Sequence, residues 1–188
     1  MHGSLSAAWL LVALCAATGA YCLLRLRSAV EEQRRTAGGE AVMGFGMALM
    51  AVPAAVVAPP RWAWLLYAVV FGGAALRALW ASRSAPGHHL HHLVGTFAMA
   101  YMALAMAARP AAHAQHGGAG APVLTGLLLL YFTAYVLWTG ARLAPLATAP
   151  SGSSPGGTVS AGWGDRPELA RACRLSMGIG MLAMLLAM

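Results

Sequence analysis

The residues in this chain best suited to chemistry are methionines, whose thioether sulfurs are neutral, soft ligands that prefer Cu(I). All ten methionines after the initiator lie in three apolar segments, and the rest of the 188-residue chain has none. They are Met43, Met47, Met50, Met99, Met102, Met106, Met177, Met181, Met184 and Met188. Chance does not produce such clustering, so the three segments need a common explanation.

A sequence repeat contains these methionines. The stretch Glu40–Met50, EAVMGFGMALM, matches Arg174–Met184, RLSMGIGMLAM: each has a polar residue followed by Met-Gly-apolar-Gly-Met-x-x-Met. His92–Met102, HLVGTFAMAYM, fits the same frame, with Gly95 in place of the first methionine and Ala98 in place of the second glycine. Similarity at this level indicates three repeated units within the chain.

The methionine spacings of four and three correspond to one face of a helix. At about 100° per residue, each set falls within an arc of about 60°. The same spacing forms the seam of a left-handed helix bundle, so the three stripes are expected to converge. Glu40, His92 and Arg174 lie on these stripes ahead of the methionines and predict a polar mouth at one end. We also expect Glu40 and Arg174 to approach each other, because a lone charge inside the interface is costly.

Membrane-spanning helices are the elements that would position these stripes. The chain is 60% hydrophobic and 9% charged, with a mean hydropathy of +0.67, whereas soluble domains carry about 25% charged residues. Several uncharged runs approach the ~20 residues needed to cross a bilayer. The sequence predicts a single integral membrane domain over 1–188, an all-α polytopic bundle of six transmembrane helices built as three tandem helix hairpins. The predicted spans are roughly 4–24, 39–57, 61–81, 89–108, 121–142 and 168–188.

Arginine placement predicts the orientation of the chain. The formal net charge is +7, and lysine is absent. With the N-terminus outside, ten of the twelve basic residues fall on the inner side, as the positive-inside rule requires. Both termini are then extracytoplasmic in a bacterial plasma membrane, and the Gly-, Pro- and Ser-rich segment 143–167 is a flexible cytoplasmic linker. Because the arginines flank apolar runs, topology explains the basicity and no nucleic-acid partner is expected.

Helices rich in methionine and opened by a polar residue, in a small multi-pass protein, resemble the actinobacterial membrane family catalogued as domain of unknown function 5134. The resemblance covers nearly the whole chain and rests on the His-x-x-Met-x-x-x-Met-x-x-Met type of repeat. This sequence departs from that pattern, since Glu40 and Arg174 stand where histidine is the better ligand and Gly95 replaces a methionine. The resemblance implies an integral membrane protein and brings no established activity.

Two functions fit the pattern. The first is binding or passage of a soft metal ion such as Cu(I) along the methionine stripes, with His92 as a further ligand. Other potential ligands are the motif HHLHH (88–92), His113, His116, Cys15, Cys22 and Cys173. The histidine pairs spaced by four and three also suit Zn(II) or Cu(II). The second function is a non-catalytic structural or assembly subunit of a membrane complex, in which methionine only fills gaps between small residues. The partners are then the lipid bilayer and either a metal ion or another membrane protein.

No catalytic activity is expected. Bis-histidine haem would need histidines at matching depth on two helices, and only the fourth span contains any. An intramembrane hydrolase needs a nucleophile with a base or metal ligands at mid-depth, and Ser4, Ser6 and Ser176 have no such partner in the sequence pattern. The odd number of cysteines argues against a disulfide framework.

Overall fold

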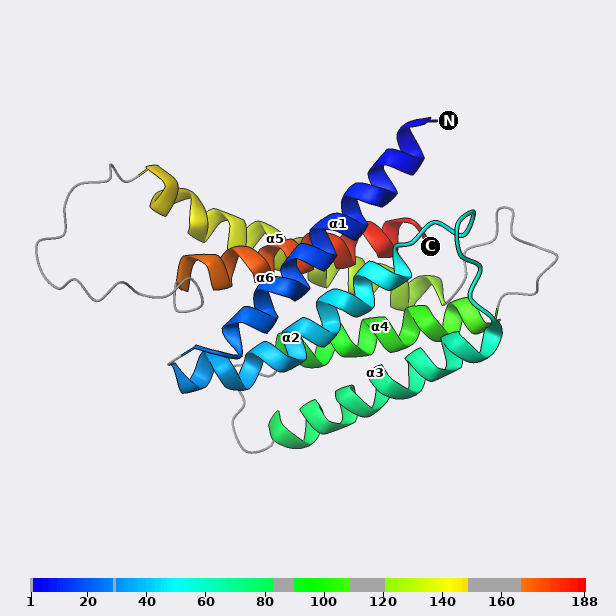
Figure 1. The fold of residues 1–188 in the computed structure, drawn as a ribbon, viewed down its shortest axis with the longest axis horizontal. Helices are drawn as coiled ribbons and strands as arrows, with labels where there is room; N and C mark the ends of the chain where they lie inside the picture. The colour runs from blue at the N-terminus through cyan, green and yellow to red at the C-terminus, as the bar shows by residue number, and fades with distance from the viewer. Residues whose placement is uncertain (1, 29, 83–89, 109–120, 149–166) are drawn as a thin grey trace, which may run out of the picture.

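The computed structural model describes residues 2–28, 30–82, 90–108, 121–148 and 167–188. Over these ranges the chain forms six α-helices and no β-strand (Figure 1). The helices are α1 (His2–Arg25), α2 (Glu31–Met50), α3 (Arg61–Ser82), α4 (Leu90–Ala108), α5 (Pro122–Thr148) and α6 (Pro167–Leu186). The predicted all-α fold with six helices is therefore confirmed for the described residues, but α2 is not among the helices with the length and apolar composition of a membrane span.

Five of these helices have the length and apolar composition of membrane spans. They contain the segments Leu5–Arg25, Arg61–Trp80, Leu90–Ala108, Pro122–Arg142 and Glu168–Leu186. The outer surface of the bundle is also apolar, and large side chains such as Leu10, Val69 and Val123 are exposed on it. An aqueous surface rarely carries so many exposed large apolar side chains, whereas a lipid-facing one is built from them.

The second helix differs from its predicted span, 39–57. α2 begins about two turns earlier, because Glu31 forms ion pairs with Arg34 and Arg35 at the i+3 and i+4 positions and so supports a polar first turn. It ends at Met50, and residues 51–60 are turns and irregular chain. Pro53 explains this end, since proline and the residue before it both disfavour continuation of a helix. The prediction that residues 51–57 belong to the span is wrong.

The fifth helix is longer than its predicted span. α5 continues six residues beyond residue 142 and ends at Thr148, so part of the predicted linker is helical. Residues 149–166, the remainder of that linker apart from Pro167, lie outside the described chain. Pro167 is itself the first residue of α6, a position where the missing N–H of proline costs nothing.

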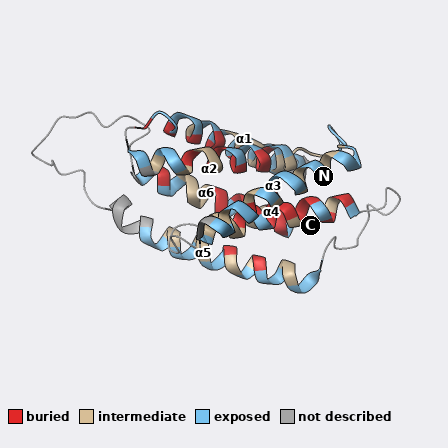
Figure 2. Cartoon of the chain, turned by 90° about the horizontal axis from the view of Figure 1, so that it is seen from below, coloured by how far each residue is buried: buried red, intermediate tan, exposed pale blue. Residues whose placement is uncertain are grey.

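The packing of the helices places the methionine-bearing ones at the centre. The most extensive contacts join α1 to α2, α3 to α4 and α5 to α6. In addition, α2, α4 and α6 all touch one another, and α1 packs against α6. Buried residues are most frequent in α2, α4 and α6, whereas the described part of α5 has few (Figure 2). The core of the bundle is therefore formed where the three repeat copies meet.

Candidate functional site

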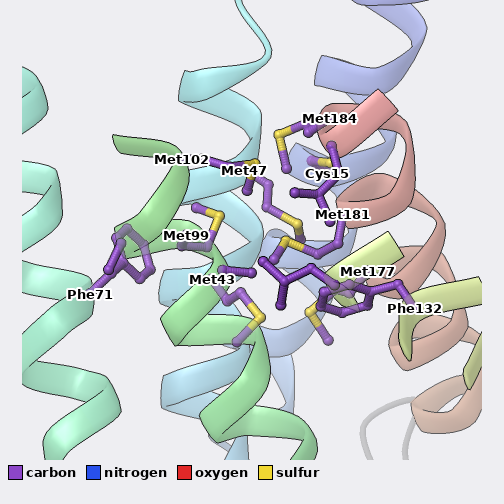
Figure 3. Packing of buried hydrophobic residues seen from close by; sticks show 14 of the residues in the cluster. Cys15, Met43, Met47, Phe71, Met99, Met102, Phe132, Met177, Met181 and Met184 are labelled. Carbon is purple, nitrogen blue, oxygen red and sulfur yellow. The ribbon is translucent and has the colours of Figure 1, made fainter. Parts of the chain in front are cut away.

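The methionine stripes of α2, α4 and α6 meet in one buried cluster, called here the methionine core. Its buried methionines are Met43, Met47, Met99, Met102, Met177, Met181 and Met184. Figure 3 shows these side chains directed toward one another from the three helices, with Cys15 of α1 beside Met181 and Met184. Apolar side chains from α3 and α5, including Phe71 and Phe132, surround the sulfurs. The core is thus rich in sulfur and closed to solvent on its sides.

The remaining methionines pack against the core or lie outside it. Met50 and Met188 are partly buried and pack against the core. Met106 is also partly buried but lies outside the cluster. The predicted convergence of the stripes therefore covers seven of the nine candidate methionine ligands fully, Met50 in part, and leaves Met106 outside.

Gly95, which replaces the first methionine of the repeat in α4, has a packing reason. A Cβ atom at this position would lie 3.0 Å from Cε and 3.2 Å from Sδ of Met43. The side chain of Met43 occupies the space that a methionine at position 95 would need. The departure from the repeat is thus complementary to its neighbour in α2.

The second glycine of the Met-Gly-x-Gly-Met motif lets the helices approach within the core. A Cβ atom on Gly180 would lie 3.2 Å from Sγ of Cys15 and 3.7 Å from Sδ of Met47. The equivalent atom on Gly46 would lie 2.5 Å from Cζ of Phe71 in α3 and 3.2 Å from Cε of Met99 in α4. In both copies the missing side chain therefore makes room for core side chains from other helices: Cys15 and Met47 at Gly180, and chiefly Phe71 at Gly46.

The first glycine of the motif faces the preceding helix instead. A Cβ atom on Gly44 would lie only 2.8 Å from Cα of Gly19 in α1, so backbone meets backbone at this point. The equivalent atom on Gly178 would lie 3.2 Å from the ring of Tyr135 in α5. The same position in the two copies thus contacts the same kind of partner, the helix just before it in the chain.

One end of the methionine core is occupied by an ion triad, defined here as Arg25, Glu40 and Arg174. Oε1 of Glu40 accepts a hydrogen bond from Nε of Arg174 at 3.0 Å, and Oε2 accepts one from Nη1 of Arg25. Glu40 is only 5% exposed and Arg25 is 0% exposed, whereas the Arg174 side chain is 38% exposed. The predicted approach of Glu40 and Arg174 is confirmed.

Sequence reasoning missed Arg25, which it treated only as a marker of orientation. A signal was present, because Cys15, Thr18, Cys22 and Arg25 repeat the spacing of three and four seen in the methionine stripes. All four residues are buried. α1 therefore carries a fourth stripe that runs from the methionine core to the triad. Within the described chain, Nε and Nη2 of Arg25 are buried without a hydrogen-bond partner, so Glu40 supplies its only ion pair among these residues.

His92 lies beside the triad, as the predicted polar mouth requires. A Cβ atom on Gly39 would lie 2.5 Å from Nε2 of His92, so the imidazole contacts the backbone next to Glu40. His91 points elsewhere and stacks on Tyr135 with a ring-centroid distance of 3.8 Å. Glu40, His92 and Arg174 thus gather at one end of the bundle.

Apart from Cys15, the other potential metal ligands that the structure describes are not members of the core. Cys15 is buried in it, while Sγ of Cys22 lies 3.8 Å from Oε2 of Glu40 and Cys173 is partly buried; all three are free thiols. His88, His89, His113 and His116 fall outside the described residues. Among the residues that are described, no group of three or more His, Cys, Asp and Glu side chains could hold a metal ion. The potential soft-metal ligands that the core itself brings together are its methionines and Cys15.

Five apolar spans around a buried core with a charged triad at one end define a helical membrane protein. The model of the family described as Domain of unknown function (DUF5134) matches residues 32–188, and the chain belongs to this family. The resemblance inferred from the methionine repeat is thereby confirmed. The matched region contains α2 to α6 apart from Glu31, and therefore all three copies of the repeat. No curated protein and no solved structure matches the chain.

Proposed function

We propose that this chain is a multi-pass protein of the bacterial plasma membrane that binds Cu(I) as substrate in the methionine core. The observation that carries the proposal is the convergence of seven buried methionines and Cys15 from four helices. Thioether sulfur is a neutral ligand that prefers Cu(I) over harder ions, so a monovalent ion is held without adding anionic groups to an apolar interior. Methionine is also flexible enough for several sulfurs to reorient around one ion.

The charge of the ion triad indicates that a cation enters the core from the end opposite to the triad. With two arginines and one glutamate it carries a formal charge of +1, which repels a cation at short range in a poorly solvated site. Met50 and Met188 pack at the other end, and Met50 lies about 15 Å from Glu40 along α2. By the positive-inside rule the triad end is cytoplasmic, the chain is three tandem hairpins with extracytoplasmic termini, and the ion reaches the core from outside.

A second candidate is a non-catalytic structural or assembly subunit of a membrane complex. The close contact of Gly44 with Gly19 favours it, because repeat glycines at helix crossings have a sufficient role in packing alone. In that case the methionines only fill irregular space between the helices. The two candidates differ in whether the sulfurs bind anything.

Metal titration separates the two candidates. Purified protein in detergent is titrated with Cu(I) against a competing chelator, and with Ag(I) as a redox-stable probe while thermal unfolding is recorded. The variant Met47→Leu/Met181→Leu removes two core sulfurs but conserves volume, so its stability changes by less than about 1.5 kcal/mol per site. We expect its Cu(I) affinity to fall at least tenfold, whereas the matched control Met106→Leu, outside the core, binds as the wild type does.

The structural candidate predicts a different result in the same titration. If neither ion shifts the melting temperature of the wild type and the double variant behaves like Met106→Leu, the core does not bind metal and the structural role stands. Zn(II) serves as the specificity control, because a thioether site discriminates against it.

A further inference from the structure

A groove on the outside of the bundle adjoins the methionine core at Gly46, Tyr67 and Phe71 but contains none of its methionines. It has a volume of about 540 Å³ and runs between α1, α2 and α3, over Leu23, Gly38, Phe45, Leu49 and Val70. Its walls are almost entirely apolar, and Phe71 is shared with the core. The bare backbone of Gly38 leaves the groove open at one end, because the nearest atom to a Cβ there is Cδ2 of Leu26, at 3.8 Å.

The length of the groove matches one leaflet of a membrane. Along α2 it extends from Gly38 to Leu49, which is about 16 Å at 1.5 Å per residue. The hydrocarbon core of a bilayer is about 30 Å thick, so each leaflet contributes about 15 Å. An extended acyl chain of a single leaflet therefore fits the groove from end to end.

The end of the groove at Gly38 is basic. Arg34 lies one turn before Gly38 on α2, Arg27 lies two residues beyond the end of α1 at Arg25, and Arg77 lies two turns after Val70 on α3. Arg27 and Arg77 are exposed, and Arg34 shares the exposed Glu31 with Arg35. In the sequence, residues 27–35 together with Arg77 contain four arginines and two glutamates, a formal charge of +2. The basic residues thus lie at one end of an apolar groove whose length matches one leaflet.

We propose that the groove binds one acyl chain of an anionic phospholipid, whose phosphate lies over Arg27, Arg34 and Arg77. Arginine side chains are suited to phosphate oxygens, and basic clusters beside spans attract anionic headgroups. A transmembrane helix of the same length and about 10 Å diameter occupies about 1,300 Å³, more than twice the groove volume. A second copy in the same orientation would also place its own basic end at the same depth, where the like charges repel.

Lipid retention tests this site directly. The full-length protein is purified, exchanged into nanodiscs or mixed micelles containing equal phosphatidylglycerol and phosphatidylcholine, and analysed by native mass spectrometry. We expect the wild type to retain one phosphatidylglycerol at least fivefold over phosphatidylcholine. Gly38→Leu fills the groove without a clash at Cβ and is expected to reduce retention at least tenfold. Gly126→Leu is the matched control, since Gly126 is exposed on α5 with nothing within 4 Å of its Cβ position.

Charge variants test the headgroup contact independently of the groove, and they carry the test if Gly38→Leu fails to fold. Arg27→Gln/Arg77→Gln is expected to abolish the preference for phosphatidylglycerol, whereas Arg171→Gln, exposed on α6, preserves it. Equal retention of the two lipids by the wild type, or unchanged retention in Gly38→Leu, overturns the proposal. A dimer that Gly38→Leu dissociates shows that a second copy occupies the groove instead. Because the Cu(I) titration uses other residues, its result does not decide this one.

Discussion

Replacing Glu40 by glutamine tests whether the ion triad holds the bundle together. Glu40 is the only described ion partner of Arg25, which is 0% exposed. Glu40→Gln preserves the size of the side chain but leaves the Arg25 charge buried without compensation. Removing one partner of a buried ion pair costs about 3–5 kcal/mol, because the remaining charge has lost its hydration and its counter-charge.

Two single variants provide reference values for the destabilisation expected in Glu40→Gln. Arg174→Gln leaves the contact between Glu40 and Arg25 in place, and the Arg174 side chain is already 38% exposed, so a loss of only about 1 kcal/mol is expected. Glu31→Gln breaks pairs with Arg34 and Arg35 in which the Glu31 side chain is 56% exposed, and its cost is about 0–1 kcal/mol. The expected order of destabilisation is therefore Glu40→Gln, then Arg174→Gln, with Glu31→Gln near zero.

The measurement is the free energy of unfolding in mixed micelles, obtained by titration with a denaturing detergent and followed by circular dichroism. The double variant Arg25→Leu/Glu40→Leu should recover most of the stability lost in Glu40→Gln, since replacing both charges by apolar side chains leaves no buried charge. If the free energy of unfolding of Glu40→Gln lies within about 1 kcal/mol of that of Glu31→Gln, then Arg25 has access to water or to another anion. The triad would then not be a buried structural link.

Two further predictions concern close contacts in the repeat. Gly44→Ala should lower stability by about 1–3 kcal/mol, because its Cβ would meet the backbone of Gly19 at 2.8 Å; Gly73→Ala, with nothing within 4 Å, should be neutral or stabilise α3 by up to about 1 kcal/mol. Equal effects of the two alanines in the same unfolding assay would contradict the helix contact. Gly95→Met should destabilise the bundle by about 1–3 kcal/mol through collision with Met43, and Met43→Ala should relieve much of that loss when the two changes are combined. A double variant less stable than Gly95→Met alone would show that the two positions do not share one space.

Helix type and approximate position were predictable, but both ends of α2 and the end of α5 were not. The hydropathy of the chain is high enough that membrane helices follow from composition and run length. The end of α2 was misplaced because the apolar run through Val56 and Val57 resembles a continuing span, whereas Pro53 stops the helix. Its start was misplaced because a polar turn held by Glu31 pairs carries no hydropathy signal. Local hydrogen-bonding and charge effects outweighed hydropathy at both ends.

The candidate site was predictable to the extent that helical periodicity determines which residues share a face. Met43 and Met47, or Met177 and Met181, must lie on one stripe because they are four residues apart in a helix. Periodicity cannot show which stripe lies against which. The absence of a methionine at Gly95 became intelligible only when Met43 was seen to occupy its place.

The sequence by itself determined an apolar, all-helical chain with three methionine stripes, each preceded by a polar residue. These are properties of composition and of residues at most a few turns apart. The tertiary structure alone decided that Glu40 lies between Arg25 and Arg174, which are 15 and 134 positions away, and that Cys15 joins the sulfurs of three other helices. Ion pairs and core contacts depend on how the helices are arranged in space, and the packing of glycines such as Gly44 against neighbouring backbone sets that arrangement.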